Sequence, residues 1–426
     1  MTSPKNVKAS KMETATRSWT ARPILSRDFM EVPPLQEVYI GILKQRKDTS
    51  KAIKNITAIL PGFAHLKRCF NGKLLLAPLR SDKSLGEKGE NISLDEEQLK
   101  TQLKERGFEL SLLEEKFQVT KVPAKSPKTK SQASEASKIW PVNFHPDQMI
   151  ESLIDGSIFD EDCLHAIERI MLMVIEAAKS EAIGNKRCTG AAVIVDPEDG
   201  RILTVAAARI DKHPMWHAAM LAVDLIARLH GGGAWQLNDE ECHGLTKRRI
   251  NEVDEKDILG DERSDTNAMT EDHSLMRRLR KIKRRYEEET PLCYPRSLSS
   301  LQFPVQTSLK MTQVARKGRR NNGTKIESSK QEECESNAKK CGPYLCTGYW
   351  AFLLMEPCPL CAMALLHSRV SRIFYGIANE TVGVLGSKAI LHTLPGLNHR
   401  YRVWNGILER ECRQTVEEIN AHRGRS

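Results

Sequence analysis

A buried strand followed at once by a helix most constrains how this chain folds. The run YWAFLLM at 349–355 is continuously apolar, and the segment CPLCAMALLHSR that starts at Cys358 has the composition of a helix. A second strand-like run, RIFYG, follows at 372–376. Strands that alternate with helices in this way predict an α/β domain with a layered sheet.

The residues upstream extend the same pattern. An amphipathic run at 161–183 predicts a long helix, and the runs at 190–196 and 201–208 predict a hairpin around the turn PEDG. A further helix is expected to open near His217. We therefore predict one layered α/β/α domain over 146–426.

A long charged stretch, 231–341, interrupts this domain. It begins with GGG and has little apolar periodicity, so we expect a mostly disordered insertion. Within it, RRLRKIKRR at 277–285 has seven basic residues in nine. That segment is either a solvated helical face or a nuclear-import or RNA-contacting element.

A smaller α+β domain is expected at 31–122. Apolar runs at 38–43 and 116–122 read as strands, and Asn71-Gly72 is a strong hairpin signal. With helical patterns at 49–60 and after residue 94, the order is β-α-β-β-α-β, which predicts a ferredoxin-like domain.

Two polar stretches flank this smaller domain. Residues 1–30 are predicted to be a disordered leader, with a mitochondrial transit peptide as the alternative, because the first 25 residues are rich in Ser, Thr, Lys and Arg. Residues 123–145 begin with PAKSPKTKSQASEASK and are predicted to be a linker without a packing face.

The composition indicates the cellular compartment of the protein and the charge of its partner. The 11 cysteines are spread along 426 residues and require no disulfide framework, and no apolar run is long enough to span a membrane. We expect an intracellular protein, in the nucleus, the cytoplasm or both. The 65 Lys and Arg exceed the 55 Asp and Glu by 10, which suits a polyanion such as nucleic acid.

Three residues have the character of zinc ligands. Cys358 and Cys361 form a Cys-x-x-Cys pair at a helix start, which lets two thiolates converge on one ion, and His217 lies at the start of another helix. The expected metal ligands are therefore His217, Cys358 and Cys361, and the expected cofactor is Zn²⁺. By contrast, His213, His367 and His392 are expected to be structural or surface residues.

The residue two positions after the histidine decides what such a site can do. In zinc deaminases that position holds a glutamate, which moves protons between the zinc-bound water and the substrate, but here it is Ala219. Since general acid–base catalysis contributes about 100- to 10,000-fold, we expect no catalytic residue in this chain. Asp211, Asp224 and Glu356 are the acids that lie closest in sequence; we expect Glu356 to support the cysteine loop.

The residues around this site resemble a known family. The runs at 342–376, 394–412 and 213–220 closely resemble the non-catalytic subunit of the eukaryotic heterodimeric tRNA adenosine deaminase, which converts the wobble adenosine to inosine. The resemblance extends more loosely to ILPGFAHLKRC at 59–69. Members commonly carry valine where this chain has Ala219, and the large basic insertion is a further departure.

The resemblance implies a cytidine-deaminase-like fold, a structural zinc and a homologous catalytic partner that supplies the active glutamate. It also implies that the amino-terminal domain helps to grip the tRNA, since a folded RNA is recognised over a wide basic surface. The candidates for phosphate contact are Lys44, Arg46, Lys47, Lys51 and Lys54 along the first helix, and Lys67, Arg68 and Lys73 around the hairpin.

Two other functions remain open at the level of sequence. One is a self-sufficient zinc-dependent nucleoside or nucleotide deaminase with a relocated acid. The other is a zinc-stabilised interaction module unrelated to RNA. The sequence also leaves open whether the carboxy-terminal tail, TVEEINAHRGRS, caps the metal.

Overall fold

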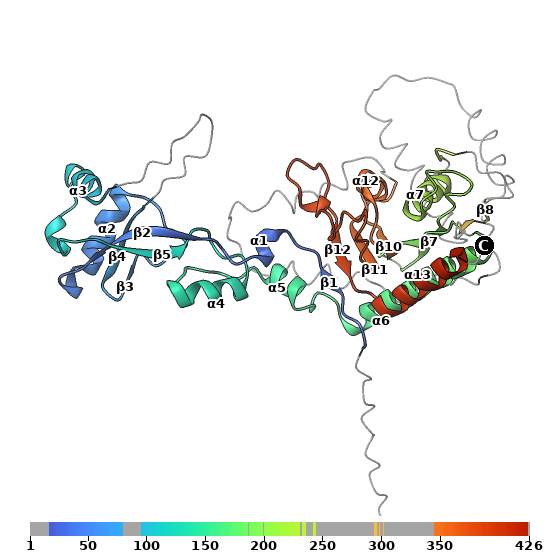
Figure 1. Cartoon of the computed structure of the whole chain (residues 1–426), viewed down its shortest axis with the longest axis horizontal. Helices are drawn as coiled ribbons and strands as arrows, with labels where there is room; N and C mark the ends of the chain where they lie inside the picture. Colours follow the sequence, from blue (N-terminus) through green and yellow to red (C-terminus); the bar gives the residue numbers. More distant parts are fainter. Residues whose placement is uncertain are drawn as a thin grey trace, which may run out of the picture. The chain divides into compact units, whose positions relative to one another are not determined.

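The chain forms two compact units, each described here by itself (Figure 1). A computed structural model describes residues 17–79, 95–185, 187–198, 200–230, 232–235, 242–243, 294–295, 298, 301 and 345–424. The carboxy-terminal unit consists of Gly156–Ser426 together with Met1–Ile24, and the amino-terminal unit is Leu25–Asp155. The chain therefore crosses between the units twice.

A mixed sheet forms the centre of the carboxy-terminal unit. Its strands are β1 (Arg22–Pro23), β6 (Ala191–Val195), β7 (Ile202–Ala207), β10 (Trp350–Met355), β11 (Arg372–Ile377) and β12 (Arg402–Asn405). Their order across the sheet is β1-β12-β11-β10-β6-β7. The pairs β10–β11 and β11–β12 are parallel, and the remaining pairs are antiparallel.

Helices cover both faces of this sheet. Helices α6 (Glu161–Gly184) and α13 (Glu409–Gly424) lie side by side on one face, while α7 (Ala218–Leu229) and α12 (Pro359–His367) cover the other (Figure 1). Alternate strand residues such as Ile194, Leu353 and Ile373 pack with α7 and α12 in one core. The expected layered α/β domain is confirmed.

The leader is shorter than predicted, because residues 17–24 belong to the fold. Trp19 and Ala21 are buried, and β1 pairs with β12 at the edge of the sheet. Arg17 donates a 3.0 Å hydrogen bond to Glu161 at the start of α6. The two buried positions alternate as a strand requires, but two apolar side chains among polar ones give no sequence signal. Residues 1–16 lie outside the described part of the chain.

The amino-terminal unit has the predicted order of elements. They are β2 (Leu35–Ile42), α2 (Thr49–Ile59), β3 (Cys69–Phe70), β4 (Lys73–Pro78), α3 (Glu96–Glu105) and β5 (Gln118–Pro123). The sheet order is β3-β4-β2-β5, with antiparallel neighbours throughout. Helices α2 and α3 pack on one face, where Ile56, Leu74 and Leu99 are buried.

The predicted linker is wrong: most of it is folded. Helix α4 (Lys130–Ile139) begins with Thr129, whose side chain accepts from the Gln132 amide. The next residue after the helix, Trp140, is buried with Val38, Ile40 and Leu75 on the second face of the amino-terminal sheet. The buried side of α4 includes the small residues Ala133 and Ala136. Because these side chains are so small, the segment has no apolar stripe that would indicate a packed helix.

The connection after α4 is also helical, and the unit boundary falls at residue 155 rather than 145. Helix α5 (Gln148–Ile154) is capped by Asp147. A four-residue helix, α1 (Arg27–Met30), precedes β2.

Little of the charged insertion is described. Strands β8 (Cys242–His243) and β9 (Tyr294–Pro295) pair with each other, and residues 232–235 continue from α7. The basic segment 277–285 lies outside the described residues, so its expected role stays a prediction. Among the helices that the structure does describe, none has the length and apolar character needed to cross a membrane.

Candidate metal centre

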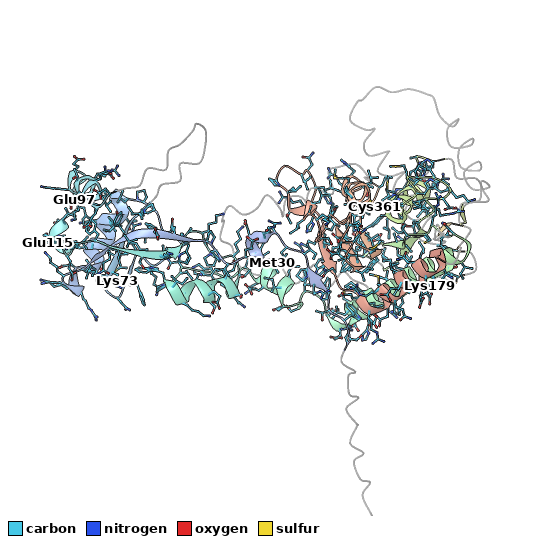
Figure 2. The ribbon with its side chains drawn as sticks, in the orientation of Figure 1. Met30, Lys73, Glu97, Glu115, Lys179 and Cys361 are labelled. Atoms are coloured by element: carbon cyan, nitrogen blue, oxygen red, sulfur yellow. The ribbon has the colours of Figure 1, made fainter. Side chains whose placement is uncertain are left out.

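Two helix starts converge at the candidate metal centre. His217 is the N-cap of α7 and Cys358 is the N-cap of α12, with Cys361 in the first turn of α12. The ligating atoms of the three residues all lie within 4.8 Å of one another, and the His217 Nδ1 to Cys358 Sγ distance is 3.6 Å. Figure 2 labels Cys361 in the carboxy-terminal unit. The structure thus brings together all three predicted ligands.

The local sequence determines where these helices begin. β10 ends at Met355, and Pro359 occupies the first turn of α12, where its fixed φ suits a helix start and its missing N–H leaves nothing unpaired. His217 has the extended backbone of an N-cap, with φ −66° and ψ 149°. At both helix starts, backbone N–H groups that have no partner within the helix therefore face the space between the candidate ligands.

Those groups favour a thiolate at one of the two cysteines. The pKa of Cys358 is lowered to about 5 by a hydrogen bond from the Cys361 thiol, and then by the Cys361 and Leu360 amides and by His217. Sharing that hydrogen bond with Cys358, together with burial, raises the pKa of Cys361. Helix N-termini stabilise thiolates in this way.

The donor set fits a tetrahedral zinc ion. One imidazole nitrogen and two thiol sulfurs form an open three-ligand set of the kind that catalytic zinc sites use, with a fourth position for water. Cys361 is buried, while His217 and Cys358 are half-buried. Within the described part of the chain, the cluster contains no carboxylate.

Ala219 lies in the first turn of α7 and is buried in the core that also contains Cys361. Its methyl group can neither accept nor donate a proton. The backbone amides of Ala219 and Met220 face the Cys361 sulfur, so this turn still serves the ligand cluster. The geometry therefore brings together the three candidate metal ligands with no proton carrier at position 219.

The Glu356 carboxylate cannot replace the missing proton carrier, because its oxygens already accept hydrogen bonds elsewhere. It is buried and accepts from the amides of Asn379 at 3.0 Å, Leu385 at 2.7 Å and Ser387 at 3.0 Å, and also from the Ser387 hydroxyl. As expected, it supports the cysteine loop, which it joins to the loop at 379–387. The hydrogen bonds from these donors give Glu356 a structural role in holding the two loops together.

The other two acids are also unsuited to replace the glutamate. Asp224 is buried further along α7, where it accepts from Arg228 and from the Ala234 amide. Asp211 is exposed in the loop before α7.

His213, His367 and His392 have structural or surface positions, as predicted. His213 accepts from the Met215 amide, His392 is hydrogen-bonded to the Ile24 carbonyl, and His367 is exposed at the end of α12.

The carboxy-terminal tail, as far as residue 424, lies away from the candidate metal centre. Its described residues belong to α13, which packs on α6 and carries the ion pair between Lys179 and Glu418. Helices α6 and α13 lie on the face of the sheet opposite α7 and α12. The tail to residue 424 therefore does not cap the ligand cluster.

Most of the basic candidates for RNA contact are exposed in the amino-terminal unit. Lys44 follows β2, Arg46 and Lys47 lie in a 3₁₀ turn (Arg46–Asp48), and Lys67 and Lys73 flank β3, with Lys73 labelled in Figure 2. In α2, Lys54 is exposed and Lys51 forms a 2.7 Å ion pair with Glu109.

Arg68 is the exception, and its prediction as a phosphate contact is wrong. Its guanidinium is buried and donates to the carbonyls of Leu60, Gly62, Leu75 and Leu76, which fixes the loop between α2 and β3. Burial lowers the pKa of Arg68 to about 10. A sequence shows that an arginine is basic but not that backbone carbonyls surround it.

Sequence reasoning also missed a group of aromatic side chains beside the metal ligand. Trp216 directly precedes His217, and its ring is stacked with His213 at a centroid distance of 5.7 Å. The run HPMWH contains both residues, but their contact with Trp235 beyond α7 could not be read from local sequence.

Comparison with known proteins identifies the family. No family model matches the chain. The "Probable inactive tRNA-specific adenosine deaminase-like protein 3" of Rattus norvegicus is 29% identical over 417 residues, which are 96% of this chain and 95% of that protein. The "tRNA-specific adenosine deaminase TAD3" of Arabidopsis thaliana is 30% identical over 297 residues, which are 68% of this chain and 71% of that protein. The chain belongs to the family of adenosine deaminase-like protein 3 and TAD3.

The human protein of the same description as the rat relative is 28% identical and spans 96% of this chain. Among solved structures, one from work on "A-to-I Editing by tRNA:A34 Deaminases at the Wobble Position of Transfer RNA" is 26% identical, covering 20% of this chain and 59% of that chain with a TM-score of 0.16. Membership of the adenosine deaminase-like protein 3 and TAD3 family therefore rests on the long sequence matches.

Proposed function

We propose that this chain is the non-catalytic, tRNA-positioning subunit of a heterodimeric tRNA adenosine deaminase that converts wobble adenosine to inosine. One observation carries the proposal: an assembled cluster of His217, Cys358 and Cys361 stands beside Ala219, where a deaminase needs a carboxylate. Family membership supports it, because relatives are described as probable inactive deaminases and as a deaminase subunit.

In this proposal the three ligands hold a structural zinc ion. Zinc would supply folding free energy, because it would tie α7 to α12 at the one point where both helices begin. His217, Cys358 and Cys361 would therefore be needed for stability and for partner binding, with no role in chemistry. The cytidine-deaminase-like fold is part of the same proposal.

The partner would be a homologous subunit that keeps the glutamate and performs the reaction. A wobble adenosine must leave the anticodon stack to reach a deaminase pocket, and this needs a second surface that holds the rest of the tRNA. The complex is proposed to act inside the cell, in the nucleus, the cytoplasm or both.

The amino-terminal unit is proposed to supply that RNA-holding surface as a ferredoxin-like domain. Its order of elements and its four-stranded antiparallel sheet support this fold. The exposed cations would contact phosphates; they are Lys44, Arg46, Lys47, Lys51, Lys54, Lys67 and Lys73.

The test is inosine formation on a tRNA with a wobble adenosine, measured for this chain alone, for a homologous deaminase subunit alone and for the mixture. We expect activity only in the mixture, lost when the partner's glutamate becomes glutamine. Ala219→Val is the matched control, and the mixture that contains it should stay active because neither side chain carries a proton.

Inosine formed by this chain alone would overturn the proposal, because another acid would then serve the metal site. If the mixture is inactive although both subunits bind tRNA, the partnership would be wrong. Loss of activity in the mixture containing Ala219→Val would show that this position contributes more than an inert methyl group.

A further inference from the structure

The start of the insertion folds back against α7. Arg228 donates to the Trp235 carbonyl, and the Ala234 amide donates to Asp224 at 2.5 Å. Asp224 and Arg228 are themselves joined by a 3.2 Å ion pair, and the Asp224 side chain is only 4% exposed. A buried acid and its partner therefore anchor residues 232–235 on the helix that begins with a metal ligand.

This anchor directs one aromatic ring onto the loop before the ligand. The Trp235 ring lies 5.7 Å from the His213 ring and 6.2 Å from the Trp216 ring, the latter in an edge-to-face arrangement. His213 and Trp216 are stacked on each other. The three rings form a closed cluster in which each touches the other two, a geometry worth more than the buried area alone.

The loop under this cluster leads directly to His217. Four backbone hydrogen bonds fold it: the Arg209 amide donates to the Trp216 carbonyl, the Lys212 and His213 amides donate to the Arg209 carbonyl, and the Trp216 amide donates to the His213 carbonyl. Trp216 is 7% exposed, so its ring has little freedom to turn. The orientation of the next residue, His217, therefore depends on where the Trp216 ring packs.

We infer that residues 232–235 act as a clamp that positions His217 and thereby couples the start of the insertion to the metal centre. Trp235 is a positioning residue in this scheme, acting through Trp216 and His213. The inference goes beyond the proposed function, although its metal readout rests on zinc binding at the three ligands. Coupling is reciprocal, so removing the metal also loosens the aromatic cluster.

The test compares full-length protein with Trp235→Ala, Trp235→Phe and Arg228→Gln. The rate at which a chelator removes zinc is measured with a colorimetric indicator, and the packing of the rings is measured by near-ultraviolet circular dichroism. Removing the groups that support metal ligands typically costs about 10- to 100-fold in affinity. We expect Trp235→Ala to release zinc about 10-fold faster, Trp235→Phe to stay near wild type, and Arg228→Gln to lie between them.

The dichroism signal of the indoles should decrease in Trp235→Ala even in metal-free protein, and removing zinc from the wild type should weaken the same signal. Equal release rates in wild type and Trp235→Ala would overturn the inference, as would Trp235→Phe behaving like Trp235→Ala. If Trp235→Ala fails to fold, the comparison of Arg228→Gln with Trp235→Phe decides. A wild-type chain that binds no zinc is a different result, which contradicts the proposed structural zinc; the dichroism of the metal-free variants then still tests the clamp.

Discussion

At position 219 this chain has alanine where zinc deaminases have the glutamate that carries protons. The position is buried beside Cys361, and its backbone amide still faces that sulfur. A residue without a carboxylate at this position therefore removes proton transfer but leaves the geometry of the candidate ligands intact. The sequence predicts both the cluster of His217, Cys358 and Cys361 and the missing acid, because each depends on residue type and spacing.

The three candidate metal ligands should matter for stability. Replacing Cys358→Ser removes one of three ligands, so zinc affinity should fall at least about 10-fold and the thermal midpoint of the carboxy-terminal unit should fall by about 5 °C or more. Zinc content and scanning calorimetry measure both effects. Cys69→Ser, a half-buried cysteine of the other unit, is the control, and similar behaviour of the two variants would contradict the assignment.

The thiol chemistry of the metal-free protein should be selective. The Cys358 pKa is lowered from 9.0 to about 5, so at pH 7 its thiolate form predominates, whereas Cys163, Cys346 and Cys412 have pKa values raised to about 12 and stay protonated. Iodoacetamide at pH 7 should therefore alkylate Cys358 first among these four. Peptide mass spectrometry identifies the product, and added zinc should protect the residue. Faster labelling of any of the other three would refute this.

Arg68 should be structural rather than RNA-binding. Arg68→Met would leave buried carbonyls without a donor, so we expect the amino-terminal unit to lose about 3 kcal/mol of stability, based on roughly 1.5–3 kcal/mol for hydrogen bonds to a charged group. Hydrogen exchange of the β2 and β4 amides measures the loss. The exposed neighbour Lys67→Ala should cost less than about 0.5 kcal/mol. Equal effects of the two substitutions would contradict the role of Arg68.

At the scale of elements, long periodic segments were predictable and short ones were not. The apolar run of β10 and the amphipathic run of α6 give strong signals, and both form where expected. Strand β1 has two residues and α4 is lined by alanines, so neither has enough apolar side chain to stand out. Both elements depend on tertiary partners: β1 pairs with β12, and α4 packs against β5 of the amino-terminal sheet.

The segment before β1 should be essential to the carboxy-terminal unit. Trp19 is buried, and Arg17 both pairs with Glu161 and lies over the Trp19 ring at 5.2 Å. Truncating a buried tryptophan to alanine costs about 3–5 kcal/mol, so Trp19→Ala should lower the thermal midpoint of this unit clearly. The exposed Met30→Ala is the control, and an unchanged midpoint in Trp19→Ala would show that the segment contributes nothing.

At the scale of the whole molecule, the net charge of +10 gives a test of RNA binding. Removing one lysine that binds a phosphate should reduce the slope of log affinity against log salt by about 1. The triple variant Lys44→Ala, Lys67→Ala, Lys73→Ala should bind tRNA more weakly and with a shallower slope. Lys138→Ala, on α4 and paired with Glu135, is the control. An unchanged slope in the triple variant would move the RNA surface elsewhere.

The pairing of β1 with β12 has a consequence for how the protein is made. Arg22 bonds to Asn405, a residue 383 positions later, so a ribosome releases the first strand of this sheet long before its partner exists. The amino-terminal unit has its complete sequence by residue 155 and can fold during synthesis, whereas the sheet of the carboxy-terminal unit closes only after β12 emerges. A chain that ends before β12 would therefore leave β1 unpaired at its opposite end, where chaperones and proteases could recognise it.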